Sequence, residues 1–366
     1  MALPPLALAV LALGARARAA PPSPDAPPEG NATSEFARFS YPGPPAPPNV
    51  ELPWGPSDCF VKQTWKRARV EQVKGVVYGA AYHPYKFKTV ELLMDVLLPP
   101  PEDRRAARPV VVFMHGGGFV HGTREEEGNT AHVLASRGYV AVTVKYRMVP
   151  GYKAWHLWSA EPAVLAVEDA RAAVRFMRKN AAKWRLDTSR IAIGGESAGA
   201  ISALYYAYAR KNSDGSPVTE GESGNPEYSS VVHAVVSISG TMVDHAFCAY
   251  IGSAPEYAPS ACLLPGPPIL PDFTPNMDAD GIPGIDMHGT ADHVVPYAGG
   301  LEWARTAAAK GVRHFLLTVP GAGHTPKKEL YNEKKPYLAQ WLTFLSGALN
   351  LKEATCPGHD AEPLLV

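Results

Sequence analysis

The stretch RIAIGGESAG, residues 190–199, is the part of the sequence that decides the fold. Its first residues, Arg190–Ile193, form a short apolar run typical of a buried strand, and a helical pattern begins at Ala198. The turn between them is so tight that the residues two positions before and after Ser197 need to be almost free of side chain, and both are glycines. The stretch predicts a strand, a sharp turn and a helix, with the Ser197 hydroxyl raised above a sheet beside the positive end of that helix.

Outward from this stretch, short apolar runs alternate with longer amphipathic ones. The clearest amphipathic run lies between residues 167 and 178, where apolar side chains recur at helical spacing. Such alternation predicts an α/β class, with a mostly parallel central sheet flanked by helices. The expected strands are Val90–Leu98, Val110–Met114, Val140–Lys145, Arg190–Ile193, Ala234–Ile238, Gly284–Met287 and His314–Val319. The other expected helices are Ala198–Arg210, Gly299–Lys310 and Glu329–Leu349.

Changes in composition along the 366 residues predict where this domain begins and ends. The segment between residues 241 and 280 has no clear period, and an irregular insertion of that length in a compact domain favours a lid or a substrate-binding loop. The expected organisation is a signal peptide at 1–19, a proline-rich arm at 20–74, the α/β domain at 75–350 with its insertion at 241–280, and a tail at 351–366.

Two features near the N-terminus predict an exported protein. The apolar run Leu6–Leu13 is long enough for a secretory signal but too short to span a bilayer, and Ala17-Arg18-Ala19 after it resembles a cleavage site. The n-region lacks a basic residue, so a leader without a signal function is the alternative. Asn31-Ala32-Thr33 is an acceptor sequence for N-glycosylation. We expect a secreted glycoprotein without a transmembrane segment.

The four cysteines fit an oxidising compartment, because an even number is compatible with disulfides. Four cysteines allow three pairings, and the expected one joins Cys248 to Cys262 and Cys59 to Cys356. None lies in a Cys-x-x-Cys or Cys/His cluster, so metal binding is the weaker interpretation and no metal is expected.

Charge argues against several classes of partner. The chain has 35 basic and 35 acidic residues, which gives a formal net charge of zero, and the two signs are mixed along it. Because no basic stripe is present, nucleic acid is not an expected partner. The hydrophobic fraction of 46% is sufficient for a globular core.

Three residues in a fixed order predict nucleophilic chemistry. A serine hydroxyl needs a base to take its proton, and two residues downstream of Ser197 each follow an expected strand: Asp292 and His324. The order serine, aspartate, histidine is that of a Ser-His-Asp triad on an α/β sheet. Asp280, Asp286, His288 and His293 are less well placed as acid or base, and the last two are interpreted as structural or pocket-lining.

The string His115-Gly116-Gly117-Gly118-Phe119 directly follows the expected strand Val110–Met114. Glycines let the backbone approach a substrate closely, and backbone amides can stabilise negative charge on a carbonyl oxygen. The expected donors of this oxyanion hole are the amides of Gly117, Gly118 and Ala198. His115 is interpreted as a brace for the loop rather than a catalytic group.

The glycine string, the serine string, His288-Gly-Thr-Ala-Asp292 and Gly323-His324 together resemble the HGGG-type carboxylesterases, the hormone-sensitive-lipase-like and related serine esterases of the α/β-hydrolase superfamily. The resemblance spans roughly residues 75–350. It implies an α/β-hydrolase fold, the triad Ser197, Asp292 and His324, and an acyl-enzyme mechanism without a cofactor. Ala200 departs from the pattern, because many relatives have a glycine there.

These features predict a secreted serine hydrolase that acts on small-molecule carboxylic esters. Expected pocket residues are Phe119, Trp155, Trp158 and His293, whose rings favour an aryl or medium-length acyl group. The alternatives are an amide-cleaving relative such as an arylformamidase or a peptidase, a neutral-lipid lipase, and a non-catalytic binding protein with the same fold. The sequence leaves the physiological substrate and the oligomeric state open.

Overall fold

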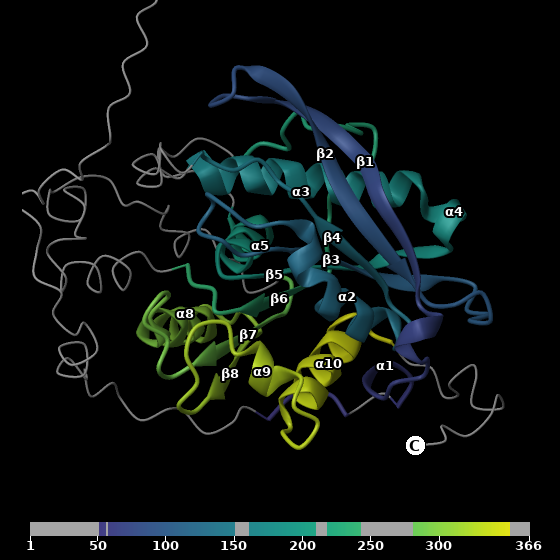
Figure 1. Cartoon of the computed structure of the whole chain (residues 1–366). Coiled ribbons are helices and arrows are strands. Elements are labelled where there is room, and N and C mark those ends of the chain that lie inside the picture. Colours follow the sequence, from purple (N-terminus) through teal and green to yellow (C-terminus); the bar gives the residue numbers. More distant parts are fainter. Residues whose placement is uncertain (1–50, 56–57, 151–160, 210–217, 243–280, 352–366) are drawn as a thin grey trace, which may run out of the picture. The chain divides into compact units, whose positions relative to one another are not determined.

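The computed structural model describes residues 51–55, 58–150, 161–209, 218–242 and 281–351. Within them, eight strands form one sheet in the order β1-β2-β4-β3-β5-β6-β7-β8 (Figure 1). The strands from β4 to β8 in this order are parallel, whereas β1 and β2 run antiparallel to their neighbours. Their bounds are β1 Glu71–His83, β2 Lys88–Leu98, β3 Arg108–Met114, β4 Val140–Val144, β5 Leu186–Glu196, β6 Ala234–Ile238, β7 Gly284–Gly289 and β8 His314–Val319.

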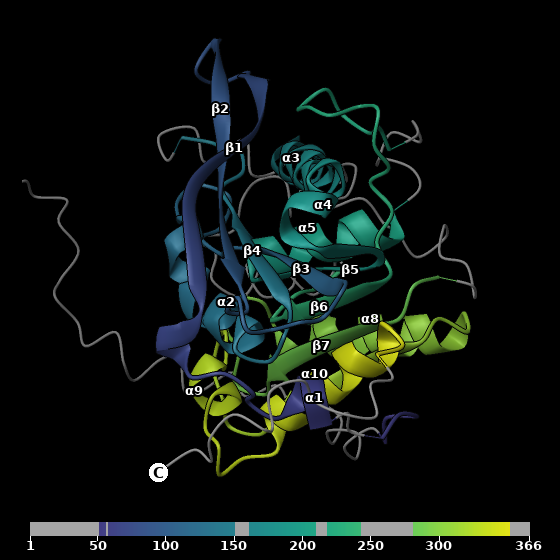
Figure 2. The ribbon, with the colours of Figure 1, turned by 90° about the vertical axis from the view of Figure 1, so that its right-hand side faces the viewer.

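Helices cover both faces of this sheet (Figure 2). One core contains side chains of α3, α5 and α8, and the other contains side chains of α1, α2 and α10. Strand β3 supplies both cores, because Val110, Val112 and Met114 point to the first and Val111 and Phe113 to the second. The helices are α1 Asp58–Val61, η2 Arg67–Arg69, η3 Arg124–Glu127, α2 Gly128–Ala135, α3 Glu161–Lys179, α4 Ala181–Trp184, α5 Ala198–Tyr208, α8 Tyr297–Ala309, α9 Lys327–Leu330 and α10 Tyr337–Ala348.

All seven expected strands are present, and β6 and β8 have the expected bounds. One expected helix, Glu329–Leu349, is wrong, because α9 ends at Leu330 and α10 begins only at Tyr337. Pro336 stands at the N-cap of α10, where a missing N–H is tolerated, and it prevents continuation from the preceding turn.

The folded part begins earlier than the expected boundary at residue 75. Strand β1 starts at Glu71, and its mixed pattern with glycines at 75 and 79 gave no strand signal in the sequence. Upstream of it, Phe60 and Trp65 are buried, and the Trp54 ring lies edge-on to Phe344 with 5.8 Å between ring centroids. Residues 51–55 and 58–74 therefore belong to the α/β domain rather than to the proline-rich arm.

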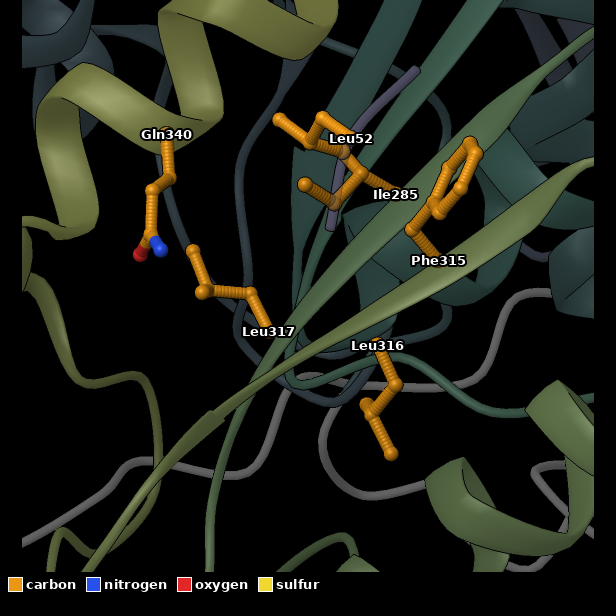
Figure 3. A pocket seen from close by; sticks show the side chains of 6 residues that line it. All are labelled: Leu52, Ile285, Phe315, Leu316, Leu317 and Gln340. Atoms are coloured by element: carbon orange, nitrogen blue, oxygen red, sulfur yellow. The ribbon is translucent and has the colours of Figure 1, made fainter. Parts of the chain in front are cut away.

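Leu52 of the same N-terminal segment lines a small pocket together with residues of β7, β8 and α10 (Figure 3). Side chains of six residues line it, and none of them belongs to the expected triad or oxyanion hole. The lining residues are Leu52, Ile285, Phe315, Leu316, Leu317 and Gln340. This pocket is therefore separate from the expected chemistry.

Several sequence-based expectations lie outside the described residues. They include the signal peptide at 1–19, the glycosylation site at Asn31, residues 243–280 of the insertion, and the tail beyond residue 351. Trp155, Trp158, Cys248, Cys262 and Cys356 also lie outside. Cys59 is buried and disulfide-bonded, but the expected pairing stays a prediction. Among the described residues, no helix combines the length and the apolar character needed to cross a bilayer.

Candidate active site

The turn between β5 and α5 holds Ser197 in a strained conformation. Its backbone has φ 51° and ψ −120°, in a region that non-glycine residues rarely adopt. A Cβ at Gly195 would lie 2.3 Å from the carbonyl carbon of Gly199, and a Cβ at Gly199 would lie 2.3 Å from the carbonyl oxygen of Met114. Both glycines are thus required sterically, which is the physical reason for the spacing in the sequence.

The structure brings Ser197, His324 and Asp292 into one hydrogen-bonded series. His324 Nε2 lies 2.9 Å from Ser197 Oγ, and His324 Nδ1 lies 2.8 Å from Asp292 Oδ2. Because a carboxylate only accepts hydrogen bonds, the Nδ1 nitrogen carries the proton and Nε2 is free to accept from the serine hydroxyl. The two loops that supply these side chains follow the parallel strands β7 and β8, whose carboxyl ends lie at the same edge of the sheet as the end of β5.

The carboxylate of Asp292 is buried, and both of its oxygens have hydrogen-bond partners. Oδ1 accepts hydrogen bonds from the backbone amides of Val294 and Val295, at 2.9 and 3.0 Å. Oδ2 faces His324 and also His288 Nε2, the latter at 3.3 Å. Burial raises the pKa of Asp292, but the hydrogen bonds from the two histidines outweigh it and hold the pKa well below its usual range. Asp292 is therefore an anion at neutral pH.

The glycine loop after β3 lies against Ser197. A Cβ at Gly116 would lie 3.3 Å from Ser197 Cβ, so the loop backbone passes beside the serine. Gly117 and Gly118 have φ values of 108° and 57°, which favour glycine. Among the described residues, no carbonyl or side chain accepts a hydrogen bond from the amide of Gly117 or Gly118. Ala198 is the first residue of α5, where backbone amides lack an acceptor within the helix.

His115 holds the start of this loop in place. Its ring stacks on Tyr146 with 4.4 Å between centroids, and its Nδ1 lies 2.7 Å from the carbonyl oxygen of Gly116. The Tyr146 hydroxyl donates to the His115 carbonyl at 2.8 Å. Burial lowers the pKa of His115 to about 4, so the ring is neutral at physiological pH. Through these contacts His115 braces the start of the glycine loop.

The expected pocket residues differ in their surroundings. Phe119 is half-buried and packs against the core that contains α3 and α5. His293 is exposed in the loop after β7. Their contact with a substrate stays a prediction, as it does for the two tryptophans outside the described residues. Of the rival acids, Asp286 faces His288 rather than His324, and Asp280 lies outside the described residues.

One charged group near the site was not expected from the sequence, and we call it the Lys327 cluster: Glu127, Lys327 and Glu196. Lys327 Nζ lies 2.8 and 2.9 Å from the two carboxylate oxygens of Glu127 and also pairs with Glu196, the residue before the serine. The three positions are far apart in sequence, so no local motif could reveal the cluster. Within the described ranges, no group of three or more His, Cys, Asp or Glu side chains has an arrangement that could hold a metal ion.

Known proteins resemble this chain in sequence. A family model described as BD-FAE matches residues 94–304, more than half of the chain. Neuroligin-like protein glit-1 of Caenorhabditis elegans is 33% identical over 127 residues, which cover 34% of this chain and 17% of that protein. Esterase LipC of Mycobacterium tuberculosis is 28% identical over 231 residues, which cover 59% of this chain and 52% of LipC. The chain spans about half the length of these curated relatives or less.

A solved structure extends the comparison to the fold. A thermophilic esterase from Thermogutta terrifontis, in its propionate-bound form, aligns with a TM-score of 0.56 at 22% sequence identity. The alignment covers 78% of this chain and 95% of that one. At this identity the likeness concerns the fold alone, and the α/β-hydrolase fold expected from the sequence is confirmed.

Proposed function

The chain belongs to the BD-FAE family, whose model covers more than half of it, and on this premise we propose that the protein is a serine hydrolase that cleaves carboxylic esters. The observation that carries the proposal is the hydrogen-bonded series from Ser197 through His324 to Asp292, with the serine on a strained turn. A nucleophile within hydrogen-bond reach of a base, which is itself oriented by a buried carboxylate, fits acyl transfer.

The acylation step follows from this geometry. Ser197 Oγ attacks the acyl carbon while His324 Nε2 takes its proton, and the carbonyl electrons move to the oxygen. The amides of Gly117, Gly118 and Ala198 stabilise that oxyanion. When the tetrahedral intermediate collapses, the bond to the alcohol oxygen breaks and His324 donates the proton to the leaving alcohol.

Deacylation repeats these steps with water as the nucleophile. His324 takes a proton from the water, whose oxygen attacks the acyl-enzyme, and then returns the proton to Ser197 as the acid leaves. Asp292 keeps the proton on His324 Nδ1 at rest and stabilises the imidazolium that forms in each half-reaction. The cycle uses no metal or organic cofactor.

Substitution of the serine tests the proposal. Ser197→Ala should lower kcat for p-nitrophenyl acetate by at least about 1,000-fold and abolish covalent labelling by a fluorophosphonate. Ser202→Ala is the matched control, because Ser202 lies one turn further along α5 and donates only to the carbonyl of Ala198. Retained labelling of Ser197→Ala would contradict the proposal. Paired ester and anilide substrates with the same acyl group separate an esterase from an amide-cleaving relative.

For the substrate, we propose a small-molecule ester whose acyl group meets Phe119, Trp155, Trp158 and His293. The support is the position of Phe119 in the glycine loop and of His293 beside Asp292. Initial rates across acyl chains from acetyl to palmitoyl, together with a feruloyl ester, measure this preference. A constant kcat/KM over the whole series would contradict a shaped acyl pocket.

We further propose that the protein is exported. The support is the disulfide bond of Cys59, because reducing compartments keep most thiols free, together with the signal-like N-terminus and the Asn31 sequence. Expression of the full chain in secreting eukaryotic cells should yield protein in the medium whose mass falls on deglycosylation, and Asn31→Gln should abolish that fall. Protein confined to the cell lysate would contradict the proposal.

A further inference from the structure

A second histidine contacts the carboxylate that orients His324. His288 lies in β7, and its side chain is fully buried. Its Nε2 lies 3.3 Å from Asp292 Oδ2, the same oxygen that accepts from His324 Nδ1. Its Nδ1 lies 2.8 Å from Asp286 Oδ2. We call Asp286, His288 and Asp292 the His288 cluster.

The protonation of His288 follows from what its two nitrogens face. Nδ1 faces the carboxylate of Asp286, and Nε2 faces the carbonyl oxygen of Val295 at 2.8 Å as well as the carboxylate of Asp292. A carbonyl oxygen and an ionised carboxylate accept hydrogen bonds and cannot donate them. In a neutral ring one nitrogen has no proton, and its lone pair would point at another acceptor inside a buried site. This is unfavourable, so both nitrogens carry protons.

The second carboxylate of the cluster is itself held as an acceptor. Asp286 Oδ1 accepts hydrogen bonds from the Ser237 hydroxyl and from the Gly240 amide at 3.2 Å, while Oδ2 faces His288. The Ser237 hydroxyl and the Gly240 amide donate to Oδ1 whichever nitrogens of His288 carry protons, so Oδ1 is an acceptor. Burial opposes a charge on His288, but the Asp286 carboxylate outweighs this effect and raises the pKa of His288 to about 10.

Few other titratable groups face His288. From α8, the Tyr297 ring lies edge-on to it at 5.8 Å between centroids. His324 follows β8 and contacts the same oxygen of Asp292, and the buried His314 on β8 lies within the field of Asp286. In the described part of the chain, no lysine or arginine forms a salt bridge with either aspartate of the cluster. The charge on His288 is therefore the fixed counter-charge to the two carboxylates.

We propose that His288 is a positioning residue that stays protonated at working pH, anchors Asp292 and limits the negative charge that His324 meets. The proposal rests on the proposed function in one respect: it takes His324 as the general base. At rest the two anions and one cation of the cluster sum to a single negative charge, which the imidazolium of His324 neutralises during acylation. The sequence alone indicated only a structural or pocket-lining residue, and the contacts with Asp292 give His288 a specific role.

Loss of this charge has a predictable consequence for the pH profile. With a neutral residue at position 288, two buried carboxylates act on His324 without a counter-charge, and its imidazolium form is stabilised. His324 then takes up a proton at a higher pH and fails as a base there. The acidic limb of kcat/KM should move to higher pH, whereas a purely structural defect would lower the rate at every pH without moving the limb.

A first experiment reads the protonation directly and does not depend on activity. In the full chain labelled with ¹⁵N at histidine, one imidazolium with both ring nitrogens protonated should persist at about pH 8.5, where ordinary histidines are neutral. His288→Gln should remove that signal. A spectrum in which the His288 ring carries one proton at this pH overturns the proposal.

A second experiment measures the pH profile of kcat/KM for p-nitrophenyl acetate. His288→Gln should move the acidic limb up by about one pH unit. The double variant Asp286→Asn/His288→Gln removes one anion with the cation, so it should return the limb to within a few tenths of a unit of the wild type. Unmoved limbs in both variants overturn the proposal. The proposed function fails separately, if Ser197→Ala keeps its activity.

Discussion

The His288 cluster and the Lys327 cluster use one arrangement, a cation between two carboxylates, for different ends. Two members of the His288 cluster lie in β7 and the third in the loop after it, so one short piece of chain supplies all of them. The Lys327 cluster joins residues 127, 196 and 327, and so ties three distant segments together beside Ser197. The cations also differ, because His288 loses its proton as the pH rises through about 10, whereas the two carboxylates keep Lys327 charged above the ordinary lysine pKa. The His288 cluster is suited to setting the charge that His324 meets, and the Lys327 cluster to holding three distant segments together.

Removal of the lysine should have the largest effect on stability. Lys327→Met leaves Glu127 buried and Glu196 mostly buried without a counter-charge, and breaking a buried pair in this way costs about 3 kcal/mol. Burial disfavours the charge on Lys327, but the two carboxylates outweigh it and raise its pKa above the ordinary value, so it is charged at all working pH values. Urea unfolding of wild type and Lys327→Met at neutral pH measures the lost free energy of unfolding.

The adjacent lysine provides the control for that experiment. Lys328 is exposed and forms no salt bridge with a described residue, so Lys328→Met should change the unfolding free energy by less than about 0.5 kcal/mol. Equal losses in the two variants would show that the cluster contributes nothing specific to stability.

The contributions of the two clusters to stability should also differ in how they depend on pH. Folded His288 keeps its proton up to its pKa of about 10, whereas an unfolded histidine releases it near pH 6.5. Between these values the folded state binds one more proton, so its advantage is complete below pH 6.5 and is lost as the pH rises through 10. The stability gap between wild type and His288→Gln should shrink by about 3 kcal/mol from about pH 7 to pH 9.5.

Unfolding free energies of both proteins at several pH values measure that change. The gap between wild type and Lys327→Met should not shrink over the same range, because Lys327 keeps its charge throughout, whereas burial raises the pKa of Glu127 to about 7 and its ionisation above that pH depends on the lysine. A gap for His288→Gln that also fails to shrink would mean that His288 is not protonated in the folded state.

A glycine packs against each cluster, and the two differ in how much room they leave. A Cβ at Gly300 on α8 would lie 2.6 Å from Nδ1 of His288, whose ring is rigid and cannot bend away. A Cβ at Gly116 would lie 3.0 Å from Glu196 Oε1, at the end of a flexible side chain. Gly300→Ala should therefore cost about 1–2 kcal/mol, and Gly116→Ala less than about 1 kcal/mol. Thermal unfolding compares them, and the reverse order would contradict this difference in rigidity.

The same contrast between local and distant contacts explains what the sequence could predict. The elbow around Ser197 was predictable because one five-residue string carries it, with Gly195 packed against Gly199, although Gly199 itself packs against Met114 of β3. Strands β6 and β8 were predictable as continuous apolar runs. Strand β1 was missed because most of its residues are exposed and two are glycines, so it has no continuous apolar run. The Lys327 cluster was missed because its three residues lie far apart in the sequence.

The smallest expected effect tests whether the Lys327 cluster depends on both of its carboxylates. Glu196→Gln removes the partly exposed carboxylate but leaves Lys327 paired with both oxygens of Glu127, where the Thr130 hydroxyl also donates. The buried charge thus keeps its partner, and the cost should be below about 1 kcal/mol, well under that of Lys327→Met. Urea unfolding of the two variants side by side gives the ratio. A cost for Glu196→Gln equal to that of Lys327→Met would mean that Glu127 alone cannot hold the lysine, and that the residue before the serine bears the connection between the three segments.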